Sequence, residues 1–186
     1  MENAPESGGW SELAGFLASL PEEDRDRFSR YAALELPAEE EGIAATLSEY
    51  SRANPTDTPA GLLATTGAQA GFAGEADLAR RSGRAALELS GTAEERALAH
   101  VSLAQTHFQS RREEEELALF ERHCRAAIEE GHSGTFCYER LATLYEYRGR
   151  LAEAEWICRR AVEVLGREDP RSAQRFQKRL QRLSAG

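Results

Sequence analysis

The sequence predicts an all-α protein. Valine, isoleucine and threonine, the residues that strands favour, are scarce among the 186 residues, and no segment alternates strictly between apolar and polar side chains. Charged residues make up 30% of the chain, which is ordinary for exposed helices, and much of the 41% hydrophobic content is alanine. We therefore expect a core built from close contacts between helices.

Apolar spacing and proline positions predict three helices in the first third of the chain. The first has its apolar face within residues 10–20. Pro21 suits the first turn of a second helix, which stops before Pro37. A third helix has apolar residues within 43–50, and residues 54–59 are the best candidate for a linker.

Two further helices and two capping motifs follow. Pro59 begins a fourth helix, the glycines of residues 71–74 break it, and a fifth helix runs to Ser90. Thr92-x-x-Glu95 and Ser110-x-x-Glu113 both have the form of a capping box, so we expect helices to begin at these two places.

Glycines and a final cap divide the rest of the chain. Residues 131–134 predict a turn, and Gly149 and Gly166 stand where the glycines that end helices belong. Asp169-Pro170 can cap a last helix whose apolar side carries Ala173, Phe176, Leu180 and Leu183. The total is about ten helices, joined by short loops that suit antiparallel neighbours.

The net charge of −9 is distributed unevenly. Residues 1–60 contain thirteen acids and four arginines, whereas residues 61–186 contain nineteen residues of each sign. The last helix has no acid and contains Arg171, Arg175, Lys178, Arg179 and Arg182. An acidic chain is a poor generic nucleic-acid binder, so nucleic acid is an unlikely partner, with this basic helix as the one reservation.

Composition also predicts the compartment. Residues 1–10 have neither the basic nor the apolar part of a secretory signal, and no stretch approaches the length of a membrane span. Three cysteines without framework spacing favour a reducing cytoplasm. One lysine against twenty-two arginines indicates a GC-rich coding sequence, which favours a bacterial source.

Similar helix endings recur along the chain. The letters AALEL occur at residues 32–36 and at 85–89, AAIEE at 126–130 and RAVEVL at 160–165. Aligned on Ala33, Ala86, Ala127 and Ala161, the endings are 53, 41 and 34 residues apart. A spacing near 34 residues indicates a repeated helical hairpin, and the long first step leaves room for one extra helix.

Upstream of these endings the chain resembles the tetratricopeptide repeat family. The last unit has Tyr138-x-x-Leu141-Ala142-x-x-Tyr145, then Gly149, then Ala154-x-x-x-Cys158-x-x-Ala161, against the family pattern W-x2-L-G-x2-Y and A-x3-F. Earlier units, around Leu63–Ala70, His100–His107 and Trp10–Leu17, match progressively less of it. In the first unit Asp26 and Arg30 stand where small and aromatic residues are expected.

The resemblance implies a right-handed superhelical array of helical hairpins. Its small residues, Ala14, Gly67, Ala104 and Ala142, would stand where the two helices of a hairpin cross. Residues 1–58 would form an N-terminal helical region, possibly a degenerate repeat plus an extra helix, 59–169 the repeats and 170–186 a capping helix.

In this family the first helices of the hairpins line a groove that binds another protein. Transferred position by position, the partner-binding residues would be Phe72, Val101, Gln105, Phe108, Gln109, Phe136, Glu139, Thr143, Glu146 and Tyr147, with Ala64 and Ala68 beside them. Exposed aromatic residues on such a face favour recognition. The alternative is that Phe72, Phe108 and Tyr147 only pack against neighbouring helices.

The groove lacks the lysines and asparagine with which one subclass of the family grips a peptide carboxylate. Glu139 and Glu146 instead suggest a ligand that is neutral or basic. A receptor for chaperone tails is therefore not expected.

Metal binding and catalysis have little support in the sequence. His123, Cys124, His132 and Cys137 lack the paired short spacings of a zinc site, and no phosphate loop, nucleophile elbow or HExxH motif occurs. The acids of residues 113–116 suit the start of a helix, where negative charge is favourable. We expect no catalytic residues, metal, cofactor or small-molecule substrate.

The sequence thus predicts a non-catalytic cytoplasmic adaptor that binds a segment of another protein. The alternative is a regulatory subunit or chaperone in transcription or secretion whose arginine-rich last helix contacts an acidic partner or nucleic acid. That helix could equally cap the array, or meet the acidic end of another copy, so a homo-oligomer is possible.

Overall fold

The computed structural model describes residues 8–184, and within them the chain is all-helical. No strand occurs in this part of the chain, which confirms the predicted class. The ten helices are α1 (Gly8–Ser19), α2 (Glu22–Ala32), α3 (Glu40–Ala53), α4 (Pro59–Phe72), α5 (Ala76–Leu89), α6 (Ala93–Gln109), α7 (Glu114–Glu129), α8 (Phe136–Tyr147), α9 (Leu151–Glu168) and α10 (Pro170–Ser184).

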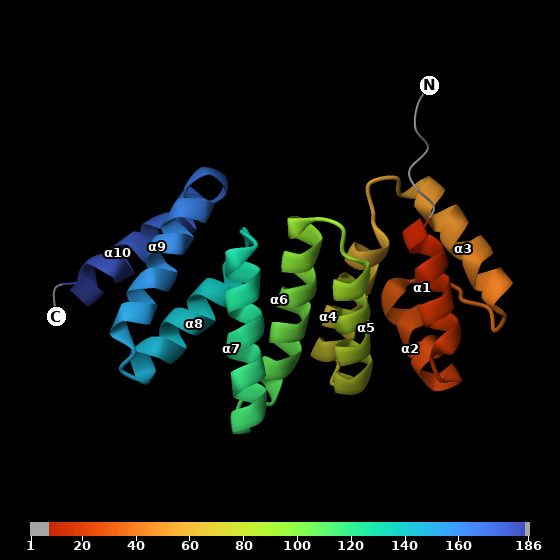
Figure 1. Cartoon of the computed structure of the whole chain (residues 1–186), viewed down its shortest axis with the longest axis horizontal. Helices are drawn as coiled ribbons and strands as arrows, with labels where there is room; N and C mark the ends of the chain where they lie inside the picture. The colour runs from red at the N-terminus through yellow and green to blue at the C-terminus, as the bar shows by residue number, and fades with distance from the viewer. Residues whose placement is uncertain (1–7, 185–186) are drawn as a thin grey trace.

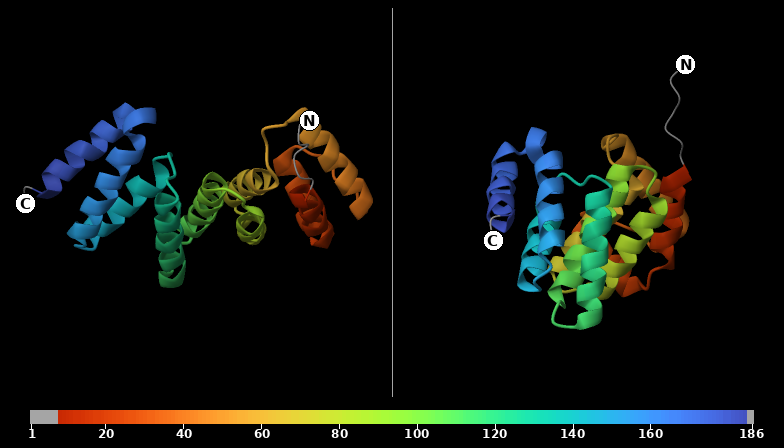
Figure 2. Two further views of the ribbon diagram at one scale, coloured as in Figure 1. Left: turned by 45° about the horizontal axis from the view of Figure 1, so that its top comes forward. Right: turned by 60° about the vertical axis from the view of Figure 1, so that its left-hand side comes forward.

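The helices form one row (Figure 1), in which α3 is at one end beside α1 and α2, and α4 to α10 follow towards the other end. α4 packs against α5, α6 against α7 and α8 against α9, and α10 lies along α9. The first helices of these pairs also contact one another, α4 with α6 and α6 with α8. The two ends of the row, α3 and α10, are far apart in Figure 1 and in the left view of Figure 2.

Small residues stand where the helices approach most closely. Gly67 is buried, and Ala104 and Ala142 have no exposed surface. A Cβ atom built on Gly67 would lie 3.1 Å from the Cβ of Ser82 on α5 and 3.2 Å from the Oγ of Ser102 on α6. Any larger side chain would push the helices apart, because interiors are close-packed.

Three of the four aligned helix endings behave alike. Ala86, Ala127 and Ala161 are fully buried, as predicted. The fourth prediction is wrong, because α2 ends at Ala32 and Ala33 is exposed with a left-handed φ of 52°. The first unit is not a hairpin of the same kind either, since α1 packs mainly along α3 while α2 contacts α4.

The predicted helix boundaries hold where a side chain satisfies the backbone. The Thr92 hydroxyl accepts from the Glu95 N–H at 3.2 Å and the Glu95 carboxylate accepts from the Thr92 N–H at 2.9 Å, a complete capping box. Asp169 accepts from the N–H of Ser172 at 3.0 Å, as expected of the last cap. Gly149 ends α8 with a φ of 70°.

One predicted boundary is wrong, because Gly166 lies inside α9, which continues to Glu168. The predicted boundary near Ser110 is correct, since α6 ends at Gln109 and α7 begins at Glu114, but Ser110 does not form a capping box. Residues 110–113 instead form a turn in which the Glu113 N–H donates to the Ser110 carbonyl at 3.0 Å. The chain therefore changes direction where predicted, but by a different hydrogen bond.

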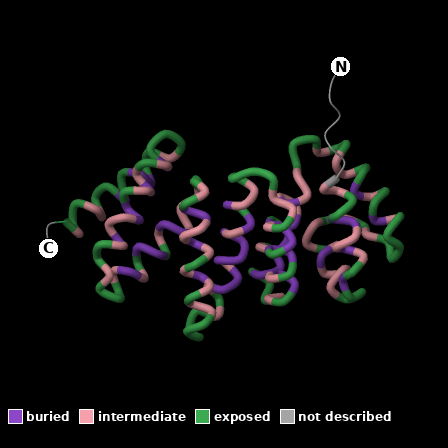
Figure 3. Tube along the Cα trace, viewed as in Figure 1, coloured by how far each residue is buried: buried purple, intermediate pink, exposed green. Residues whose placement is uncertain are grey.

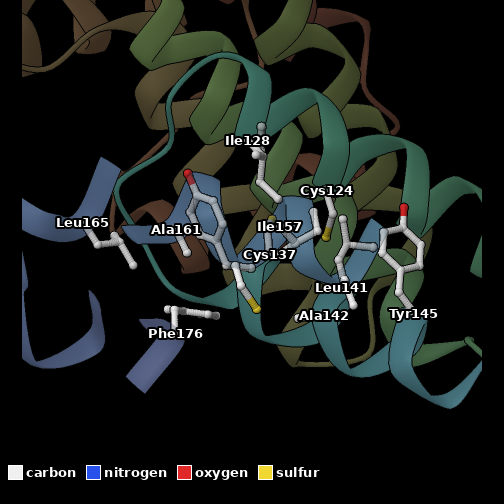
Figure 4. Close-up of a cluster of buried hydrophobic side chains, with 14 of the residues drawn as sticks. Cys124, Ile128, Cys137, Leu141, Ala142, Tyr145, Ile157, Ala161, Leu165 and Phe176 are labelled. Atoms are coloured by element: carbon white, nitrogen blue, oxygen red, sulfur yellow. The ribbon is translucent and has the colours of Figure 1, made fainter. Parts of the chain in front are cut away.

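The buried side chains form two apolar clusters along the row (Figure 3). One joins α1–α3 to α4 and α5 and extends to Ala99 of α6, so the core continues across residue 58. The other begins at Val101 of α6 and runs to Phe176 of α10. In the second cluster Ile128, Leu141 and Ile157 come from three consecutive helices (Figure 4).

Candidate functional site

The predicted partner-binding side chains occupy equivalent places on α4, α6 and α8. Counting from the small crossing residue of each helix, Gly67, Ala104 or Ala142, the same offsets recur. Three residues before it stand Ala64, Val101 and Glu139, one after it Ala68, Gln105 and Thr143, and five after it Phe72, Gln109 and Tyr147. Because α4 and α6 are neighbours and α6 also contacts α8, residues at the same offset occupy equivalent places on consecutive pairs of the row.

Exposure rises along the helices towards their C-terminal ends. Ala64 is 1% and Val101 6% exposed, so the core leaves little of either for a partner. Phe72, in contrast, is 72% and Tyr147 90% exposed, and Gln109 between them is also exposed. We call Phe72, Gln109 and Tyr147 the edge row, and it is the most accessible line of the predicted groove.

Gln109 connects the edge row to the neighbouring helix. Its amide Nε2 donates to the backbone carbonyl of Gly71 at 2.7 Å, next to Phe72. The Gly71 carbonyl also accepts from the backbone N–H of Gly74 at 3.0 Å, so Gln109 adds a second hydrogen bond at the last turn of α4. The ends of α4 and α6 are thereby held together.

Phe108 and Phe136 belong to the core and not to an open groove. The Phe108 ring centroid lies 5.0 Å from that of Phe120 and 5.9 Å from that of Phe136. The guanidinium carbons of Arg111 and Arg140 lie 4.4 and 5.0 Å from the centroid of Phe108. The packing alternative therefore describes these two phenylalanines, while Phe72 and Tyr147 stay exposed.

The predicted groove residues on α8 are engaged by α10. Arg175 forms an ion pair with Glu139 at 3.0 Å, and Arg179 donates to the Thr143 hydroxyl at 3.0 Å. Glu146 pairs with Arg179 and, at 3.1 Å, with Arg182. The two glutamates are neutralised within the chain, so they no longer argue for a neutral or basic ligand.

This pairing has a signal in the sequence that the sequence analysis did not use. Residues 139, 143 and 146 are spaced by four and three, and residues 175, 179 and 182 repeat that spacing 36 residues later. Such spacings place each set on one helix face. Two helices with matched spacing and complementary groups are candidates for neighbours.

A hollow of about 330 Å³ lies between α8 and α10. It is lined by Glu139, Arg140, Thr143, Arg175, Phe176 and Arg179. Three guanidinium groups face one carboxylate there, so the hollow is electropositive. It can accept a carboxylate from a partner close to the Thr143 position of the predicted groove.

Larger hollows lie near the N-terminal end, where sequence reasoning assigned no site. One of about 880 Å³ lies among α1, α3 and the start of α4, with Trp10, Pro59 and Leu89 in its wall. The Trp10 ring packs edge-on against Tyr50 at 6.0 Å. Trp10 and Leu89 belong to the predicted repeat units, but the repeat pattern assigns no binding role to either residue.

Three histidines form a polar cluster between α6 and α7. The Nδ1 atoms of His100 and His123 are 3.0 Å apart, and the rings of His107 and His123 stack at 5.5 Å. The Nδ1 of His107 lies 2.7 Å from Glu116, which also pairs with Arg80 at 3.1 Å. His100 and His107 thus fill the aromatic positions of the repeat as packed imidazoles.

Burial controls the protonation of this cluster. It lowers the pKa of His123 to about 3, with further lowering from the neighbouring histidines. Burial also lowers the pKa of His100. Burial would raise the pKa of Glu116, but the hydrogen bond with His107 and the charge of Arg80 lower it overall.

The cysteines and histidines do not assemble into a metal site in the part of the chain described. Residues 8–184 contain no group of three or more histidine, cysteine, aspartate or glutamate side chains placed to hold a metal ion. Cys124, Cys137 and Cys158 are buried free thiols. Burial raises the pKa of Cys124 and, to about 11, that of Cys158, which makes both thiols poor nucleophiles.

The length and hydrophobicity of the helices, and the similarity of the chain to known proteins, complete the description. None of the helices within residues 8–184 is long and apolar enough to cross a membrane. No protein-family model, no curated protein and no solved structure matches this chain. The function proposed below is therefore argued from the geometry of the chain itself.

Proposed function

We propose that this protein is a non-catalytic adaptor of the tetratricopeptide type, which binds a segment of another protein along the ends of α4, α6 and α8. The helical pairs, their spacing in sequence and the small residues at their crossings support an array of this kind. Binding of this type needs no cofactor and no small-molecule substrate.

The observation that carries the proposal is the exposure of Phe72 and Tyr147 at equivalent positions of two hairpins. Single exposed apolar residues are common, but a phenylalanine and a tyrosine at the same offset, on helices joined through α6, form a line. Aromatic side chains are enriched among residues that dominate binding energy. Gln109, between them, offers a side-chain carbonyl that can accept from a partner backbone.

The electropositive hollow beside Thr143 adds a chemical preference. Arg140 is exposed, and Arg175 keeps 64% of its side chain exposed although it pairs with Glu139. A partner segment with apolar residues on the edge row and a carboxylate in the hollow satisfies both features. The proposed partner is therefore an apolar segment with an acidic flank.

Affinity capture from the source organism, followed by binding measurements on the captured partner, tests this function. We expect Phe72→Ala and Tyr147→Ala each to weaken binding by about tenfold or more, which is typical of central aromatic anchors. Leu98→Ala and Leu151→Ala are matched controls, because these leucines are also exposed large apolar residues but lie off the edge row.

The controls separate the edge row from general surface hydrophobicity. Equal binding by all four variants would show that the edge row is the wrong surface. Phe108→Ala is not a suitable probe, because removing this ring also disturbs its packing with Phe120 and Phe136.

A regulatory subunit that acts through α10 is the second candidate. It is supported by the exposed cations of that helix, but Arg175, Arg179 and Arg182 already pair with acids of α8. Salt titration of the complex separates the candidates. A loss of affinity by orders of magnitude between low and moderate salt favours contact through several cations of α10, whereas the shallow dependence expected of one partner carboxylate in the hollow favours the edge row.

A further inference from the structure

The two ends of the helical row have opposite charge. Residues 8–58, which form α1–α3 and the following loop, contain eleven acids and four arginines. The opposite end is α10, with five cations and no acid. Because α3 and α10 lie at opposite ends of the row in Figure 1 and in the left view of Figure 2, these charges cannot neutralise one another within one molecule.

The cations of α10 form a continuous stripe on its outer side. Arg171, Arg175, Lys178 and Arg182 are exposed and follow the helix at intervals of four, three and four residues, which places them on one face. The stripe is about 16 Å long at the usual helical rise. We call these four residues the basic stripe.

The basic stripe is only partly neutralised by α8. Arg171 and Lys178 form no ion pair within residues 8–184. Arg175 and Arg182 pair with Glu139 and Glu146, but 64% and 69% of their side chains remain exposed. The stripe can therefore attract a further acidic surface.

An acidic surface of this kind is present on α3. Glu40, Glu41 and Glu49 are exposed on this helix, and Glu39 lies at its start. In the described part of the chain none of them takes part in an ion pair, whereas Asp24 of α2 is already paired with Arg81 and Arg27. The α3 carboxylates are the exposed counterpart of the basic stripe.

We propose that the basic stripe of one molecule docks on the α3 carboxylates of a second copy. Every molecule supplies both surfaces at the same concentration, and neither surface can reach the other in its own chain. The contact joins different surfaces of two copies, so it leaves one free stripe and one free α3 after each addition. Association therefore continues head to tail and does not stop at a dimer.

Two double variants remove one surface each without breaking a contact described above. Arg171→Glu with Lys178→Glu removes the basic stripe, and Glu41→Lys with Glu49→Lys removes the acidic surface. All four positions are exposed and lie outside the ion pairs of residues 8–184, so both variants should fold as the parent does. Circular dichroism and thermal melting check this before the association experiment.

Light scattering after size exclusion measures the mass of the full chain from low micromolar to roughly 0.1 mM, at about 20 mM and about 500 mM salt. At low salt we expect the parent mass to rise with concentration beyond twice the 20.5 kDa of one chain, and at high salt to return to that of one chain. Each double variant alone should stay at the mass of one chain.

An equimolar mixture of the two double variants is the decisive sample. One variant retains its α3 carboxylates and the other its basic stripe, so the original contact can form in the mixture, and the reversed stripe can also dock on the reversed α3. The mass should therefore rise above that of one chain, as in the parent. A gain in mass that occurs only on mixing shows that the two surfaces bind each other.

Three outcomes would overturn the proposal. The parent could remain a single chain at low salt, the variants could associate as the parent does, or the mixture could show no gain in mass. A parent that stays monomeric but binds a single-stranded oligonucleotide, with binding lost in Arg171→Glu/Lys178→Glu, would assign the stripe to nucleic acid instead. The edge row is unchanged in all samples, so failure here leaves the adaptor function standing.

Discussion

The Nδ1 atoms of His100 and His123 lie 3.0 Å apart, so one of these imidazoles donates to the other and the two rings share one proton. A second proton would place two positive charges at this distance in a half-buried site between α6 and α7. The pair formed by His100 and His123 is therefore most stable while both of these histidines are neutral.

Stability should fall as the pH drops below about 6.5. The unfolded chain titrates near 6.5, but burial lowers the pKa of His123 to about 3 and also lowers that of His100. Below 6.5 the unfolded chain takes up protons that the folded chain does not, so the free energy of unfolding decreases. Each such histidine contributes up to about 1.4 kcal/mol per pH unit.

Urea unfolding between about pH 7 and pH 5 measures this slope. His123→Gln retains a polar side chain but cannot titrate, so we expect a clearly shallower slope than in the parent. An identical slope in the variant would mean that other groups cause the acid sensitivity.

A charged side chain at Ala161 should destabilise the protein severely. Ala161 is fully buried in the cluster formed by α7–α10, where no space exists for a guanidinium group (Figure 4). We expect Ala161→Arg to lower the free energy of unfolding by at least about 3 kcal/mol through overpacking and charge burial. Ala152→Arg is the matched control in the same helix, because Ala152 is exposed. Similar melting curves for the two variants would contradict the packing described for Ala161.

Two glycine-to-alanine changes should have opposite signs. Gly166 lies inside α9, and a Cβ atom built there has no atom within 4 Å, so Gly166→Ala should stabilise by about 0.5–1 kcal/mol. Gly149 has a φ of 70°, which strains an alanine, so Gly149→Ala should destabilise by about 1 kcal/mol. Denaturation of both variants checks the pair, and a shift of the same sign would be inconsistent with these backbone conformations.

Loss of the Glu146 charge should weaken the attachment of α10. The Glu146 carboxylate pairs with Arg179, which keeps only 20% of its side chain exposed, and with Arg182. Glu146→Gln leaves a largely covered guanidinium without its counter-charge and should cost about 1–2 kcal/mol. Glu163→Gln removes an equal charge from a carboxylate that is 68% exposed, so it should cost less than about 0.5 kcal/mol. Urea unfolding at neutral pH compares the two, and equal costs would show that α10 is held by its apolar contacts alone.

The sequence could predict the helices and most of their closest contacts, because local chemistry determines both. The capping box at Thr92 and the cap at Asp169 depend on neighbouring residues, and both occur as predicted. Ala86, Ala127 and Ala161 recur because each lies in a close helix contact, so spacing alone identifies them.

The same five-residue sequence, AALEL, has different structures at its two occurrences because the residues that follow it differ. AALEL ends α5 at Leu89, but at residues 32–36 the helix stops at Ala32. Pro37 keeps the second helix from continuing through residue 36, since the residue before a proline avoids helical conformation, and the left-handed Ala33 ends it earlier. Gly166 misled in the opposite direction, because one glycine costs a helix interior only about 1 kcal/mol and α9 continues through it.

The candidate site was predictable only in part. The offsets that place Phe72 and Tyr147 on one line follow from the repeat spacing. The pairing of Glu139 with Arg175 depends instead on how α10 lies over α8, which is a tertiary contact across 36 residues. The matched spacing places each set of side chains on one helix face, but it does not by itself show which two faces meet.

The division of the buried side chains within α6 has a mechanical consequence. Ala99 belongs to the N-terminal cluster, and Val101, half a turn further along, belongs to the C-terminal one. α6 thus contributes buried side chains to both clusters, so a substitution that disturbs this helix can loosen the packing on either side of it.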